Sequence, residues 1–115
     1  MPDKTVYSIT DTGYIELKKT LRSYIEHFEY DFVHFMIATF FIKVFEKEIA
    51  VDILSNRLDC LRKIDAGIGE QMEMLETQKI PADVKCSVNH NALLIKAEIA
   101  ATQEHIKVIE LSKEW

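Results

Sequence analysis

The chain has 115 residues, 48% of them hydrophobic, and a net charge of −5 at pH 7. This length supports one domain with a modest core, and the hydrophobic content excludes a disordered chain. Acidic side chains outnumber basic ones in each of the ranges 1–30, 31–85 and 86–115. Because affinity for a polyanion depends on basic side chains, nucleic-acid binding by this chain alone is disfavoured.

Sequence features that would indicate secretion, membrane insertion or catalysis are lacking. Cys60 and Cys86 are isolated thiols without metal-ligand spacing, and the sequence holds neither a secretory signal nor an apolar run long enough to span a bilayer. This favours a cytoplasmic protein with reduced cysteines and no membrane partner. The three glycines form no phosphate-binding loop and no nucleophile motif occurs, so we predict neither an enzyme nor a cofactor.

The chain begins with a short β-prone run. Val6, Ser8 and Thr10 alternate with Tyr7 and Ile9, a period of two that predicts a strand. The following residues 11–13 stop the strand and supply the capping chemistry of a helix.

Four helices are expected after this strand, over about 12–27, 31–45 and 46–78, and from 87 or 89 to the C-terminus. The second is apolar almost all round, which indicates burial on several sides and, in a small protein, a partner subunit. The third has a nearly heptad apolar seam, interrupted by Gly67 and Gly69, which we expect to mark a kink or a close helix approach. Pro81 is expected to start a loop.

The pattern Tyr7-x-Ile9-Thr10-x-x-Gly13-x-x-x-Leu17 resembles the last wing strand and following helix of PadR-family winged-helix transcriptional regulators. Residues 30–32 with the aromatic helix that follows them, and 53–61 in the long helix, are similar to the C-terminal domain of that family. The resemblance implies a bacterial, dimeric repressor. The helices that precede the wing, including the recognition helix, are absent from this sequence, so DNA would be reached only through a missing N-terminal domain.

The fold expected from this reading is all-α, with the short N-terminal strand as a wing remnant and a helical hairpin or bundle that forms a homodimer. Residues 1–28 would be the remnant of the winged-helix domain, and 29–115 the dimerisation and effector domain. The residues predicted for the dimer interface are Phe32, Phe35, Ile42, Leu54, Leu58, Leu61, Ile64 and Ile68.

Two further sets of residues follow from the aromatic cluster and from the resemblance. Aromatic side chains gather between positions 28 and 45, where core and interface packing is the favoured interpretation and a small-molecule effector pocket is the functional one. The candidate pocket residues are His27, Phe28, Tyr30 and His34. On the first helix, Lys18, Lys19 and Arg22 are candidate contacts to the DNA backbone, or else a solvated face.

Two alternatives stay open. His27, Asp31 and His34 have a spacing that could present metal ligands on one helix face, but their neighbours are aromatic, so we predict no metal site. In place of a sensing role, the chain could be a stand-alone helical interaction protein that pairs with a full-length regulator and titrates it.

Overall fold

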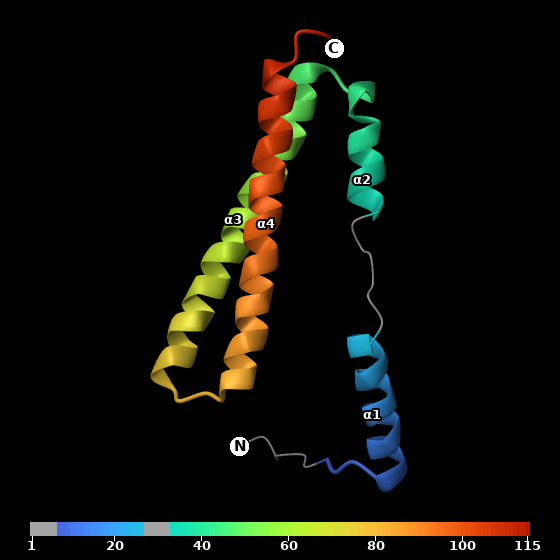
Figure 1. Cartoon of the computed structure of the whole chain (residues 1–115), viewed down its shortest axis with the longest axis vertical. Coiled ribbons are helices and arrows are strands. Elements are labelled where there is room, and N and C mark those ends of the chain that lie inside the picture. The colour runs from blue at the N-terminus through green and yellow to red at the C-terminus, as the bar shows by residue number, and fades with distance from the viewer. Residues whose placement is uncertain (1–6, 27–32) are drawn as a thin grey trace, which may run out of the picture. The chain divides into compact units, whose positions relative to one another are not determined.

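The structure is a computed structural model that describes residues 7–26 and 33–115. It contains α1 (Asp11–Glu26), α2 (Val33–Phe40), the short 3-10 helix η1 (Ile42–Val44), α3 (Lys47–Thr77) and α4 (Ala82–Leu111) (Figure 1). The all-helical class is therefore confirmed for the described residues. The chain divides into two compact units, Met1–Phe40 and Phe41–Trp115. The domain boundary predicted at 28/29 lies outside the described residues.

The predicted N-terminal strand is not seen. Tyr7 to Thr10 form neither strand nor helix, and Val6 lies outside the described residues. A strand needs a neighbouring strand for its backbone hydrogen bonds, and the described residues supply none. The helix cap comes from Thr10, which was expected in the strand, and not from residues 11–13, because the Oγ1 atom of Thr10 accepts a hydrogen bond from the backbone N–H of Gly13 at 3.0 Å.

The second helix is shorter than predicted. It ends at Phe40 instead of continuing to 45, and the chain turns through η1 before Phe45 adopts an extended conformation. The residues at this end are aromatic or β-branched, and such side chains lose rotamer freedom against the preceding helical turn. All described residues of α2 are at least partly exposed to solvent.

The longest element, α3, has almost the predicted bounds, but two other expectations were wrong. Gly67 and Gly69 lie inside the continuous helix, and no atom lies within 4 Å of a Cβ added at either position. They therefore mark neither an interruption nor a close approach within this chain. The fourth helix begins at Ala82, well before 87, because Pro81 starts a helix rather than a loop. Its fixed φ suits a helix start, and Asp83 in the first turn complements the helix dipole.

In the second unit, α3 and α4 form a hairpin around a narrow core. The turn between them places Lys79 in the left-handed region, with φ 50°, and Lys85 pairs with Glu76 at 3.9 Å across it. The buried side chains of the hairpin are Ala50, Leu54, Leu58, Leu61 and Ile68 from α3, and Thr102 and Ile109 from α4. Their spacing places them on one face of each helix.

The far end of the hairpin is tied to the C-terminal residues. The ammonium group of Lys47 donates a hydrogen bond to the carbonyl oxygen of Ser112 at 2.6 Å, and the indole N–H of Trp115 donates one to the carbonyl of Phe45 at 2.8 Å. Lys43 lies 5.9 Å from the centre of the Trp115 ring. The segment after α4 therefore holds η1 and the start of α3 in place.

We expect Gly69→Ala to stabilise the hairpin. The added methyl group meets open space, and alanine in a helix interior is favoured over glycine by about 1 kcal/mol. Urea unfolding followed by circular dichroism measures the change. Ala66→Gly, at an exposed position of the same helix, is the matched control and should lower the free energy of unfolding by a similar amount. A Gly69→Ala variant less stable than the parent would contradict the continuous helix.

Candidate interaction surface

Half of the residues predicted for the dimer interface are buried inside the hairpin. Leu54, Leu58, Leu61 and Ile68 are buried within the second unit, where α3 packs against α4. Their heptad-like spacing is thus accounted for by contact with the helix that follows in the same chain. The other members are placed differently: Ile64 is 48% exposed, Phe35 and Ile42 are half-buried, and Phe32 lies outside the described residues. Their role in a dimer stays a prediction.

The candidate effector residues are not assembled into a pocket among the described residues. His27, Phe28 and Tyr30 lie outside them, and His34 is exposed on α2. No group of histidine, cysteine or carboxylate side chains suited to a metal ion occurs in the part of the chain that the structure describes.

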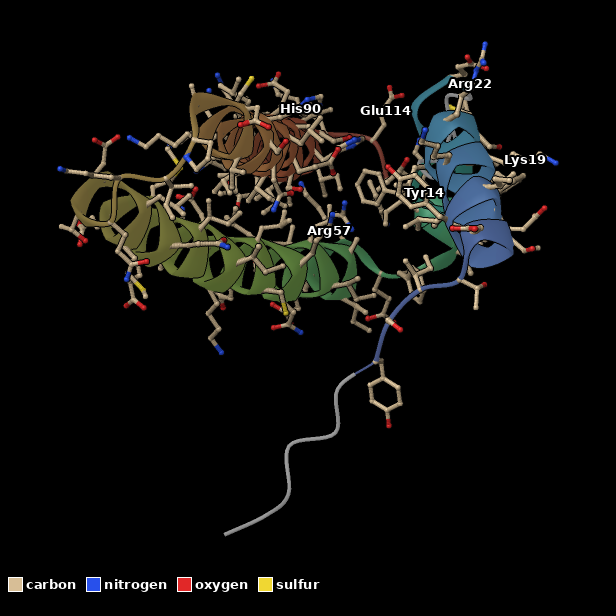
Figure 2. All side chains as sticks on the ribbon, turned by 90° about the horizontal axis from the view of Figure 1, so that it is seen from below. Tyr14, Lys19, Arg22, Arg57, His90 and Glu114 are labelled. Carbon is tan, nitrogen blue, oxygen red and sulfur yellow. The ribbon has the colours of Figure 1, made fainter. Side chains whose placement is uncertain are left out.

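The three basic residues of α1 are exposed and contact other side chains of the same helix (Figure 2). Lys19 pairs with Glu16 at 3.7 Å and Arg22 with Glu26 at 2.5 Å. The ammonium group of Lys18 lies 4.9 Å from the centre of the Tyr14 ring. Because acidic neighbours offset two of the three charges, this face offers only weak attraction to a phosphate backbone.

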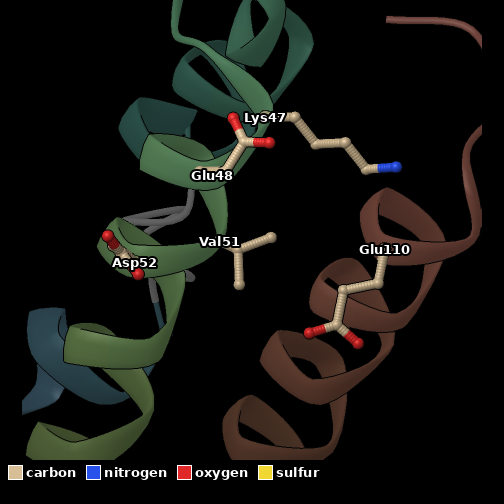
Figure 3. A pocket seen from close by; sticks show the side chains of 5 residues that line it. All are labelled: Lys47, Glu48, Val51, Asp52 and Glu110. Atoms are coloured by element: carbon tan, nitrogen blue, oxygen red, sulfur yellow. The ribbon is translucent and has the colours of Figure 1, made fainter.

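Two hollows lie between α3 and α4. One, of 310 Å³, lies near the start of α3 and is lined by Lys47, Glu48, Val51, Asp52 and Glu110 (Figure 3). The other, of 450 Å³, is lined by Asp65, Ala66, Ile68, Gly69, Met72, Asn89, Ala92 and Lys96. The first is open and lined by three exposed carboxylates, and the second is more enclosed and carries one charge of each sign, Asp65 and Lys96. Neither brings together a nucleophile and a base, so the geometry gives no support to catalysis.

The exposed apolar surface of the hairpin is its most distinctive feature. Helix α4 carries apolar side chains on two opposite sides. One side packs on α3 through residues such as Thr102 and Ile109. The other, which we term the outer face of α4, points away from α3 and consists of Leu93, Leu94, Ala97, Ala101, Val108 and Leu111.

The large side chains of the outer face are strongly exposed. Leu93 is 59%, Val108 58% and Leu111 70% exposed. A helix with one solvated side shows a polar stripe opposite its core stripe, whereas α4 shows large apolar residues there beside His90 and Glu104. Large apolar side chains that recur in solvent along one side of a helix indicate an interaction site.

Helix α3 has a second apolar stripe that is also exposed. Ile49, Ile53, Ile64 and Met74 recur at helical spacing on one side of this helix and are between 41% and 58% exposed. The hairpin therefore presents apolar surface on more than one side.

The apolar residues that make up the outer face of α4 are visible in the sequence, but they were not distinguished from the residues that pack on α3. In the sequence, Ile95, Ile99, Ile106 and Ile109 can be taken as one stripe that Leu94, Ala101, Val108 and Leu111 widen. At 3.6 residues per turn the two sets fall on different sides of the helix, and only the first set faces α3.

Comparison with family models, curated proteins and solved structures found no match to this chain. None of the described helices is both long and apolar enough to cross a membrane.

The ion pair between the two helices provides a test of the hairpin. Arg57 reaches from α3 towards α4 (Figure 2), and its guanidinium donates to the Glu98 carboxylate at 2.7 Å, with both side chains partly buried. In a double-mutant cycle with Arg57→Ala and Glu98→Ala, we expect a coupling energy of about 1 kcal/mol. The pair Lys85–Glu76 is the control and should give a smaller value, because its atoms are 3.9 Å apart and Glu76 is 69% exposed. Equal coupling energies would contradict the closer contact between Arg57 and Glu98.

Proposed function

We propose that the α3–α4 hairpin joins two copies of this chain, as the dimerisation part of a PadR-like transcriptional regulator in the bacterial cytoplasm. The observation that supports this proposal is the exposed apolar outer face of α4. A pair of helices buries only the faces that they turn towards each other, and stable domains cover the remaining apolar faces with another layer. A second copy of the hairpin supplies such a layer.

The narrowness of the core supports the same conclusion. The hairpin buries few large side chains, and Thr102 is among its most buried residues, at 0% exposure. Small domains with limited cores commonly depend on oligomerisation for stability. The two long helices, of 31 and 30 residues, provide the length over which pairing can bury more surface.

Pairing suits the regulator that the N-terminal sequence resembles. A dimer fixes the separation of two DNA-reading heads, and an effector bound near α2 would act by biasing that separation. The acidic charge of the chain fits this proposal, since DNA contact would fall to a separate DNA-reading domain and not to the hairpin. DNA reading and effector binding are therefore secondary parts of the proposal, and pairing is the part that the hairpin geometry supports directly.

The mass of the chain in solution tests the proposal. We expect light scattering after size exclusion to give twice the 13.4 kDa of one chain. A mass of one chain throughout the micromolar range would overturn the dimerisation function.

Two substitutions separate folding of the hairpin from pairing. Leu61→Asp buries a charge in the core between α3 and α4, where Leu61 is 8% exposed, and should abolish most of the helical signal in circular dichroism. Val108→Asp changes an exposed residue, and we expect it to keep the helical signal while shifting the mass towards one chain. A Leu61→Asp variant that stays helical but becomes monomeric would instead place Leu61 in the interface between copies.

A further inference from the structure

We infer that the second copy packs antiparallel on the outer face of α4, about a two-fold axis at Ala97, with His90 of each copy opposite Glu104 of the other. This inference rests on the proposed dimerisation and specifies its seam.

The middle of the outer face is made of small residues. Ala97, Ala100 and Ala101 are all exposed, and small side chains let two helix backbones approach closely. An axis at Ala97 places Leu93 of one copy opposite Ala101 of the other, since these residues lie equally far on either side of the axis. Large side chains then fit against small ones, as in interdigitated helix packing.

The two polar residues His90 and Glu104 on this side of α4 select the antiparallel direction. His90 and Glu104 are both exposed, and His90 lies on the side of α4 away from α3 (Figure 2). A parallel pair in register would set Glu104 against Glu104, which is unfavourable. The antiparallel pair sets an imidazole, whose ring N–H can donate, against a carboxylate that accepts, twice in each dimer. Antiparallel helix dipoles also favour this direction.

Contact between His90 and Glu104 within one chain is excluded by distance. The two residues are nearly four helical turns apart on α4, which is roughly 21 Å along the helix axis. No ion pair among the described residues involves either of them. Any energetic coupling between these two positions would therefore report a contact between copies.

The exposed stripe of α3 is a weaker candidate for the same role. The residues that separate Ile49, Ile53, Ile64 and Met74 along that side are uncharged, and they include Asn56 and Gln71. A neutral stripe specifies neither a direction nor a register. The outer face of α4 carries a hydrogen-bond donor, His90, and a carboxylate, Glu104, placed symmetrically about Ala97, so it specifies both.

A charge exchange tests the seam. We expect His90→Glu and Glu104→Lys, made singly, each to weaken the dimer roughly 10-fold in Kd. His90→Glu sets like charges opposite each other at two places, and Glu104→Lys removes the carboxylate that accepts a hydrogen bond at both places. The double variant His90→Glu/Glu104→Lys sets opposite charges at both places and should return Kd to within about 3-fold of the parent. Sedimentation equilibrium measures all four values. Additive losses in the double variant would overturn the antiparallel register.

Disulfide cross-linking tests the position of the axis independently. In a chain carrying Cys60→Ser and Cys86→Ser, Ala97→Cys should form a disulfide-linked dimer under mild oxidation, because a residue on a two-fold axis meets its own counterpart. Gln103→Cys, an exposed position off the outer face of the same helix, is the matched control and should cross-link slowly.

The two experiments distinguish failure of the seam from failure of the proposed function. A parent chain that is dimeric by mass, but shows neither charge rescue nor cross-linking through position 97, overturns the seam and leaves dimerisation standing. A parent chain with the mass of one copy overturns both.

Discussion

The packing of α3 against α4 is the contact on which the rest of the structure depends. Two helices of 31 and 30 residues meet along one row of side chains, and a pair of helices can bury only one side of each member. The Lys85–Glu76 pair closes one end, and the bonds of Lys47 and Trp115 hold the other. The same contact leaves apolar residues on the far side of α4 in solvent, so the arrangement that forms the hairpin also creates its interaction surface.

Helix periodicity predicted the bounds of α3 well, because its apolar seam is regular and continuous. The ends of the other elements depend on proline geometry and on backbone partners, which helix periodicity does not report. Pro81 was interpreted as a loop residue, although a proline is equally suited to a helix start. The strand over 6–10 was predicted from local alternation, but a strand forms only where a second strand supplies its backbone partners. Gly67 and Gly69 were expected to disturb α3, yet two glycines cost too little to break a helix whose other side is well packed.

The candidate interaction surface was likewise predicted only in part from the sequence. A heptad seam indicates that a helix packs on another helix. It does not indicate whether the second helix belongs to the same chain or to another copy. For Leu54, Leu58 and Leu61 the short turn before α4 decides the matter, because it returns the chain directly onto α3. The outer face of α4 could have been found by plotting its apolar residues around the helix. Apolar residues on both sides of that plot indicate a helix with two neighbours, of which the second unit supplies one, α3.

An antiparallel seam centred on Ala97 has a geometric consequence for a regulator. Ser112 accepts a hydrogen bond from Lys47, so the start of α3, and the connection to the first unit before it, lies beside the end of α4. That end is about 22 Å from the axis at Ala97, so the two connections in a dimer lie about 45 Å apart along α4. Successive half-sites on one side of DNA are about 34–36 Å apart, a separation of similar size. A dimer joined antiparallel through α4 would therefore separate its two connections by a distance of this order, whereas a parallel pair would bring both connections to one end.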